Sequence, residues 1–151
     1  MYDLIGDIHG HATELKALLA KMDYRETDGV WQHPERTVIF LGDFVDRGPE
    51  QVETVTIARN MVEKGHALAV MGNHEFNAVA WATEDPQNPG EHLRPHIDKN
   101  LKQHRAFLEQ VGEGSELHHS MIEWFKTLPV YLDLPEFRVV HACWHPEHLA
   151  A

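Results

Sequence analysis

Three short apolar runs in the sequence each end in a glycine followed by a polar residue. The runs are "YDLIGD" (2–7), "TVIFLGD" (37–43) and "HALAVMGN" (66–73). They have the length of strands, and the second lacks alternation of polar and apolar residues, which favours burial on both faces. Each run is followed by a segment with apolar residues at helical spacing. This order predicts right-handed crossovers and an α/β fold with an open, mostly parallel sheet flanked by helices.

The spacing of apolar residues predicts helices over 11–22, about 50–64 and 74–83. The glycine at position 65 is a natural stop for the second helix. The residues expected to face the core are Leu15, Leu18, Leu19, Met22, Val52, Val55, Ala58, Val62, Phe76, Val79 and Ala80. Trp81 is also expected in the core, with a position in a substrate groove as the alternative.

The second half of the chain is less regular. The polar, proline-bearing segment 84–100 is either a surface excursion or a lid near a site. Two helices are expected after it, over 101–111 and from about Ser115. The second is expected to carry one apolar stripe of Leu117, Met121, Trp124, Phe125 and Leu128. Two strands, in "VYLDL" (130–134) and "FRVVHAC" (137–143), are expected to be joined by a short Pro-Glu turn.

Composition limits the class of protein. The chain has 151 residues, 42% of them hydrophobic, which suits a single domain over 1–151 with a sizeable core. Its single cysteine excludes an internal disulfide and fits a reducing compartment. We see no secretory signal and no run near the roughly 20 apolar residues that span a bilayer, so we expect a cytoplasmic protein without membrane partners.

The formal net charge of -11 disfavours bulk binding of nucleic acid, whose backbone is also negative. An anionic substrate remains compatible with this charge because bound metal ions can reverse its sign locally.

Polar residues of one chemical type follow the predicted strands. They are Asp7 and His9, then Asp43, Asp46 and Arg47, then Asn73, His74 and Glu75, and later His141. Ligands of open α/β sheets bind outside the carboxyl ends of the strands, where these residues would meet. Carboxylate, imidazole and carboxamide groups suit Mn, Fe, Zn or Co. Each pair alone is most simply a turn or a surface group, but the set together predicts a site for two metal ions.

Three stretches carry a family resemblance. "GDIHG" (6–10), "GDFVDRGP" (42–49) and "GNHE" (72–75) resemble the first three motifs of the calcineurin-like metallophosphoesterases. They are nearest to the phosphoprotein phosphatase branch and its bacterial relatives, which include diadenosine tetraphosphate hydrolases. "VVHAC" (139–143) is similar to the later His-Ala-Gly segment of that family. A dinucleotide-binding fold of the Rossmann type is excluded because no Gly-x-Gly-x-x-Gly follows the first strand.

The resemblance implies two divalent metal ions, with manganese the preferred identity. Asp7 and His9 would bind the first ion, Asp43 would bridge both, and Asn73 and His141 would bind the second.

The resemblance also implies three catalytic residues. Arg47 would grip phosphate oxygens with its planar fork, and His74 would donate a proton to the leaving oxygen. Asp46 would orient that imidazole. A hydroxide bridging the metals would attack phosphorus in line with the leaving group.

These roles imply a phosphoesterase. We expect a phosphomonoester substrate, either a phosphoprotein or a small molecule, with symmetrical dinucleoside tetraphosphate hydrolysis as the alternative. An alternative from another class is a non-catalytic fragment or scaffold that binds metal or phosphate.

The sequence departs from the family pattern near its end. A further Gly-His motif that completes the metal shell in the family is missing, so we expect either a truncated domain or a natural short form. Cys143 stands where many relatives have glycine, and we favour a small core residue there over a thiol near the metals. His145 and His148 are expected in a surface tail rather than as substitute ligands.

Other histidines are expected to have no role in the site. His11 borders the first motif, but a surface position is favoured for it. Solvent-facing positions are expected for His92, His96, His104, His118 and His119.

Overall fold

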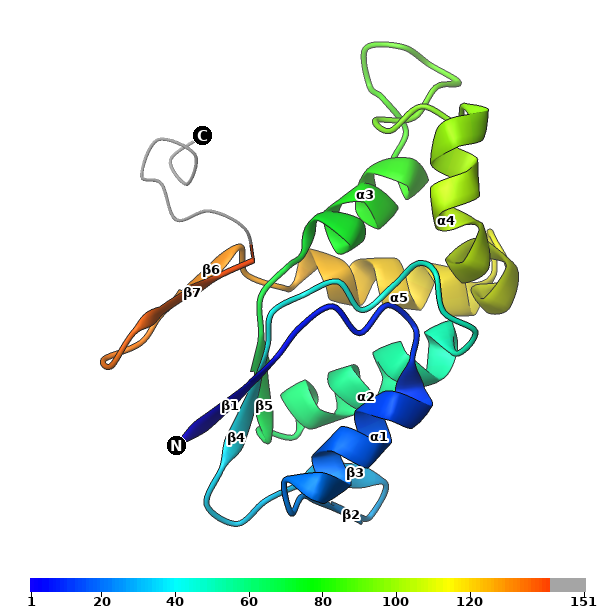
Figure 1. Ribbon diagram of the computed structural model, residues 1–151. Helices are drawn as coiled ribbons and strands as arrows, with labels where there is room; N and C mark the ends of the chain where they lie inside the picture. Colours follow the sequence, from blue (N-terminus) through cyan, green and yellow to red (C-terminus); the bar gives the residue numbers. More distant parts are fainter. Residues whose placement is uncertain (142–151) are drawn as a thin grey trace.

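The centre of the fold is a three-stranded parallel sheet in the order β1-β4-β5. Figure 1 shows the computed structural model, which describes residues 1–141. The strands are β1 (Tyr2–Ile5), β4 (Thr37–Phe40) and β5 (Ala67–Ala69). Residues 38–40 of the central strand are fully buried, as the lack of alternation in that run predicts. The predicted parallel α/β sheet is therefore confirmed.

Five helices accompany the sheet within residues 1–141. They are α1 (Ala12–Lys21), α2 (Gln51–Glu63), α3 (Asn73–Ala82), α4 (Asp98–Val111) and α5 (Glu116–Lys126). Val38 and Phe40 of β4 belong to the large apolar cluster that these helices share, so the helices cover that face of the sheet. The helix expected over 101–111 begins three residues earlier than predicted.

A hairpin of β6 (Tyr131–Asp133) and β7 (Arg138–Val140) packs on the opposite face of the sheet. There Ile39 of β4 forms a small apolar cluster with Val70 and Val139. From the sequence, the strand before His141 was predicted among the parallel strands, and this prediction was wrong. The strand β7 is antiparallel to β6 and outside the three-stranded sheet, so His141 reaches the site from a second layer.

A second hairpin was not predicted. It consists of β2 (Arg25–Thr27) and β3 (Val30–Gln32), joined by Asp28 and Gly29, both with positive φ. An Asp-Gly pair is the common sequence of a tight hairpin turn. The sequence contains this Asp-Gly pair, but the two strands beside it are too polar to resemble a buried apolar run.

Three apolar helix positions were predicted on the wrong face. Leu18, Phe76 and Leu117 are exposed, with Phe76 reaching 63%. The inward face of α3 is rotated from the predicted one and carries Glu75 and Ala78 together with Trp81. The rotation follows from the buried contacts of the Glu75 carboxylate with backbone N–H groups. The predicted core position of Trp81 is confirmed.

The segment between α3 and α4 folds back on the end of α3. The backbone nitrogens of Leu93 and Arg94 donate to carbonyl oxygens of Thr83 and Ala80, at 2.9 and 3.0 Å. The ring of His96 stacks on Trp81 with centroids 3.7 Å apart. These contacts favour the surface excursion over the lid. Within residues 1–141, no helix has the length and apolar character needed to cross a membrane.

Candidate metal centre

A cavity of about 690 Å³ lies at the carboxyl ends of the three parallel strands. Its lining residues are Gly6, Asp7, His9, His11, Leu41, Asp43, Arg47, Asn73, His74 and His141. All five predicted metal ligands are in this set, together with two of the three predicted catalytic residues. The third, Asp46, is buried behind His74. His11 is exposed, as the sequence predicted, and it also borders the cavity.

The backbone at the site is unusual because several residues other than glycine adopt left-handed conformations. The φ angles are 52° at Asp7, 46° at His9, 59° at Asp43, 73° at Asp46 and 80° at Arg47. Such conformations cost of order 1–3 kcal/mol each and persist only where the surroundings fix them.

Hydrogen bonds between the loops after β1 and β4 hold this backbone. The nitrogen of His9 donates to the Asp43 carbonyl at 2.9 Å, and that of Gly10 donates to the Phe44 carbonyl at 2.8 Å. The nitrogen of Gly48 donates back to the His9 carbonyl at 2.8 Å. The first and second motifs are therefore joined through their backbones.

Two glycines let the second and third motifs approach closely. A Cβ on Gly42 would lie 2.4 Å from the nitrogen of Gly72, and a Cβ on Gly72 would lie 2.4 Å from the nitrogen of Asp43. Any side chain at either position would force these loops apart.

Glu75 is a structural residue of the site to which the sequence argument gave no role. Its fully buried carboxylate accepts hydrogen bonds from the backbone nitrogens of Gly72, Asp43, Phe44 and Val45, at 2.7–3.3 Å. Burial raises the pKa of Glu75 to about 7, against the opposing effect of the backbone donors. The available signal was the glutamate of "GNHE", whose place in the first helical turn allows it to reach back to backbone nitrogens.

Two histidines of the cavity are held in one tautomer. Nδ1 of His9 lies 2.9 Å from the Val45 carbonyl oxygen, and Nδ1 of His141 lies 2.7 Å from that of Leu41. A carbonyl only accepts, so each Nδ1 carries a proton, and in the neutral form of either ring the lone pair lies on Nε2. This is how metal-binding histidines are commonly oriented.

The free lone pairs face oxygen atoms. Nε2 of His141 lies 2.8 Å from Oδ1 of Asn73 and 3.1 Å from Oδ2 of Asp43. Nε2 of His9 lies 3.9 Å from the same Asp43 oxygen. A lone pair and these oxygens repel one another, and a cation among them removes the repulsion. The donor set therefore fits divalent metal ions.

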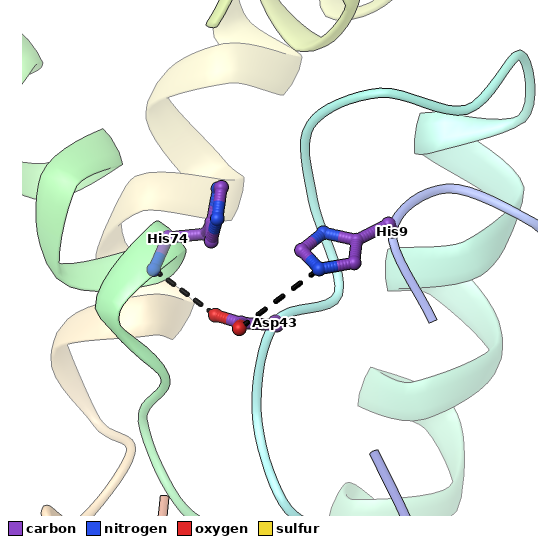
Figure 2. A group of neighbouring side chains, drawn as sticks. All are labelled: His9, Asp43 and His74. Carbon is purple, nitrogen blue, oxygen red and sulfur yellow. Dashed lines mark hydrogen bonds and ion pairs between the residues drawn. The ribbon is translucent and has the colours of Figure 1, made fainter. Parts of the chain in front are cut away.

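Two groups of side chains are close enough to hold an ion each. One consists of His9, Asp43 and His74, and the other of Asp7, Asp43 and His141. Figure 2 shows the His9 ring directed at the Asp43 carboxylate, to which His74 is linked through its backbone nitrogen. In each group the ligand atoms lie within 4.8 Å of one another. Asp43 belongs to both groups, so its carboxylate lies between two candidate ion positions. The grouping pairs Asp7 with His141, whereas the family resemblance pairs it with His9.

Asp46 links two imidazoles behind the cavity. Its Oδ2 lies 2.6 Å from Nδ1 of His74, and its Oδ1 lies 2.6 Å from Nδ1 of His104. Burial raises the pKa of Asp46, but the hydrogen bonds of His104 and His74 outweigh it, so that pKa is lowered. The hydrogen bond to Asp46 raises the pKa of His74.

The predictions for the remaining histidines had mixed outcomes. His104 and His118 were predicted to face solvent, and both predictions were wrong, since they are 4% and 6% exposed. The apolar faces of α4 and α5 include these two rings, which pack on Phe107. His96 and His119 are exposed as predicted, and His92 is half-buried. Cys143, His145 and His148 lie outside the described residues.

Comparison with known proteins identifies relatives. The model of the family "Calcineurin-like phosphoesterase" matches residues 2–147. The chain is 30% identical over 149 residues to the asymmetrical bis(5'-nucleosyl)-tetraphosphatase PrpE of Oceanobacillus iheyensis, covering 97% of this chain and 57% of that protein. It is 46% identical over 133 residues to the protein of the same name from Bacillus velezensis, a match that covers 86% of this chain and 50% of that protein.

Solved structures share the fold. A cold-active protein tyrosine phosphatase superposes with a TM-score of 0.67 at 18% identity, over 99% of this chain and 43% of that one. This chain therefore spans about half the length of the relatives it matches. From the family match over almost the whole sequence, the chain belongs to the calcineurin-like phosphoesterase family.

Proposed function

We propose that the cavity at the strand ends is the active site of a metal-dependent phosphoesterase. The observation that carries this proposal is the position of Asp43, whose carboxylate belongs to both candidate ligand groups. The lone pairs of His9 and His141, directed at oxygen atoms, support it further.

The chain would hold two divalent ions through the set predicted from sequence. These residues are Asp7, His9, Asp43, Asn73 and His141, all of which line one cavity. Divalent ions bound there would polarise phosphate oxygens and lower the pKa of coordinated water.

The remaining roles belong to side chains of the cavity and its wall. Arg47 lines the cavity and has no ion-pair partner within residues 1–141, so its guanidinium is free to bind phosphate oxygens. Nδ1 of His74 is held by Asp46, which leaves Nε2 to give a proton to the leaving oxygen.

The names of the relatives favour a dinucleoside tetraphosphate as substrate. The relatives from Oceanobacillus and Bacillus are named asymmetrical tetraphosphatases, and a shorter match, over 60% of this chain, is to one named symmetrical. A phosphomonoester is the second candidate, favoured by the Asp46-Arg47-Gly48 run of the second motif.

One assay separates these possibilities. The purified chain, with Mn²⁺ added, is given diadenosine tetraphosphate or p-nitrophenyl phosphate, with Asp43→Asn as control. Adenosine products are separated by anion-exchange chromatography, since symmetrical cleavage gives only diphosphate and asymmetrical cleavage gives mono- and triphosphate. If neither substrate shows metal-dependent turnover, the proposal of an enzyme fails and a metal- or phosphate-binding scaffold is the better account.

A further inference from the structure

A second groove, of about 590 Å³, adjoins the candidate metal centre along α4. Its lining residues are Arg47, Asn73, His74, Asn77, Lys102, Gln103, Arg105, Ala106 and Glu109. The first three also line the metal cavity, so the two spaces lie side by side.

The charge of this groove is opposite to that of the whole chain. Three cationic side chains, Arg47, Lys102 and Arg105, line it against the single carboxylate of Glu109, in a chain whose formal net charge is -11. Within residues 1–141, Lys102, like Arg47, makes no ion pair. Arg105 and Glu109 are 3.8 Å apart and mostly exposed, and such a surface pair holds Arg105 only weakly. These cations are available to an anionic ligand.

We propose that this groove, which we call the α4 groove, binds the phosphates of the substrate that lie beyond the bond being broken. The inference rests on the proposed phosphoesterase function with a dinucleoside tetraphosphate as substrate, and it assigns a binding place to the phosphates that do not react. A monoester has one phosphate, which the metal cavity accommodates. Arg47 lines both the metal cavity and the α4 groove. A phosphate bound in the groove would therefore lie directly beside the reacting phosphate. Neighbouring phosphates of a polyphosphate chain, which share one bridging oxygen, have this arrangement.

Substitution of Lys102 and Arg105, the two cationic residues of α4 that line the groove, tests this proposal. We expect Lys102→Ala and Arg105→Ala each to raise KM for diadenosine tetraphosphate about fivefold, with the double variant near the product of the two. Turnover of p-nitrophenyl phosphate is expected to stay within about twofold of wild type. Lys64→Ala, which removes an exposed charge at the end of α2, is the matched control.

Equal effects on both substrates, or none, would overturn the α4 groove as a polyphosphate site. A binding measurement tests the α4 groove separately from the proposed phosphoesterase function. Calorimetry without metal compares inorganic tripolyphosphate with orthophosphate. We expect tripolyphosphate to bind more tightly to the wild type and to lose that advantage in the double variant, whether or not the chain has turnover. Equal affinity for the two anions in the wild type contradicts the proposal.

A different observation concerns His104 of α4. Its ring is buried between Trp81 and Phe107, and its Nε2 has no hydrogen-bond partner within residues 1–141. Among the residues that the structure describes, the one polar contact of the ring is the 2.6 Å hydrogen bond from Nδ1 to Oδ1 of Asp46. Burying an imidazole for packing alone is costly, so this bond is the reason for a histidine there.

We infer that His104 is a positioning residue for the proposed proton donor, His74. A carboxylate bonded at one oxygen can rotate about its own axis. His104 fixes the second oxygen of Asp46 and thereby the plane in which the first oxygen meets Nδ1 of His74. This inference depends on the proposed role of His74 but not on the α4 groove.

The variants His104→Asn and His104→Leu test the inference. The amide nitrogen of asparagine takes the place of Nδ1, whereas leucine, of similar size, has no donor. We expect His104→Leu to lower kcat for phenyl phosphate, which has a poor leaving group, about tenfold more than kcat for p-nitrophenyl phosphate, with KM unchanged. His104→Asn is expected to restore most of that difference.

The ratio of the two kcat values does not depend on how much of a variant folds, so reduced stability does not imitate the effect. If both variants lower the two kcat values by the same factor, His104 is only a packing residue.

Discussion

The carboxylate of Glu75 accepts a hydrogen bond from the backbone nitrogen of Asp43 at 2.7 Å. The same Oε1 accepts from the nitrogen of Gly72 at 3.0 Å, and Oε2 accepts from that of Phe44 at 2.8 Å. The first turn of α3 is thereby joined to the loop after β4. The position of the proposed bridging carboxylate depends on a glutamate 32 residues away.

We expect Glu75→Gln to destabilise the fold by about 2–3 kcal/mol. An amide group must place its NH₂ where one oxygen now accepts backbone N–H bonds, which leaves buried donors facing a donor. The measurement is urea unfolding followed by circular dichroism. Glu109→Gln, at an exposed site on α4, is the control and is expected to change stability by less than about 0.5 kcal/mol. Equal stability of the two variants would contradict this account.

Substitution of Gly42 by alanine is expected to be more harmful than the same change at Gly29. Both residues have positive φ, 92° and 78°, so both variants lose about 1 kcal/mol to backbone strain. Only at Gly42 does the new Cβ also meet backbone, at 2.4 Å from the nitrogen of Gly72, whereas at Gly29 no atom lies within 4 Å. We expect unfolding free energies to differ by at least about 2 kcal/mol, and comparable values would show that the loops can separate.

A partly buried ion pair between Arg36 and Asp3 predicts how stability responds to acid. The guanidinium of Arg36 donates to the carboxylate of Asp3 on β1, and the Tyr24 hydroxyl donates to it at 2.8 Å. The hydrogen bond from Arg36 is the largest cause of the lowered pKa of Asp3, and it prevails over the opposing effect of burial. A lowered folded-state pKa gives stability that is present above the unfolded value and is lost as pH falls through the folded one.

We therefore expect Asp3→Asn to be less stable than wild type at pH 7 and the difference to shrink below about pH 4. Urea unfolding at several pH values from about 7 to 2.5 measures it. Asp133→Asn serves as the control because Asp133 lies 3.6 Å from Arg138 in an exposed pair. A difference between Asp3→Asn and wild type that does not change with pH would show that the variant loses packing rather than charge.

Metal binding is expected to raise the unfolding temperature. Ions that bind only the folded chain stabilise it by mass action, so added Mn²⁺ should shift the wild-type transition upward. Asp43 belongs to both ligand groups and Asp7 to one. We expect Asp43→Asn to abolish the shift and Asp7→Asn to reduce it. Mass spectrometry is expected to count two ions in the wild type, one in Asp7→Asn and almost none in Asp43→Asn.

Asp98→Asn, an exposed substitution at the start of α4, is expected to behave as wild type in the same experiment. A full shift in Asp43→Asn would place the ions elsewhere.

The sequence by itself determined the sheet and the residues at its edge. Apolar runs of strand length, each stopped by glycine and followed by a helical pattern, allow few arrangements other than parallel strands. Parallel strands bring their carboxyl ends together, so Asp7, Asp43 and Asn73 could be placed at one edge without coordinates. All three line the same cavity.

The tertiary structure alone decided which side chains support that edge. Whether a glutamate or a histidine faces inward depends on the donors and acceptors it meets, and these come from distant segments. Glu75 turned α3 from its expected face because backbone nitrogens of the loop after β4 face it. His104 can be buried because the carboxylate of Asp46, 58 residues away, accepts a hydrogen bond from its ring. Such contacts have no local period or spacing, so the sequence does not display them before the chain has folded.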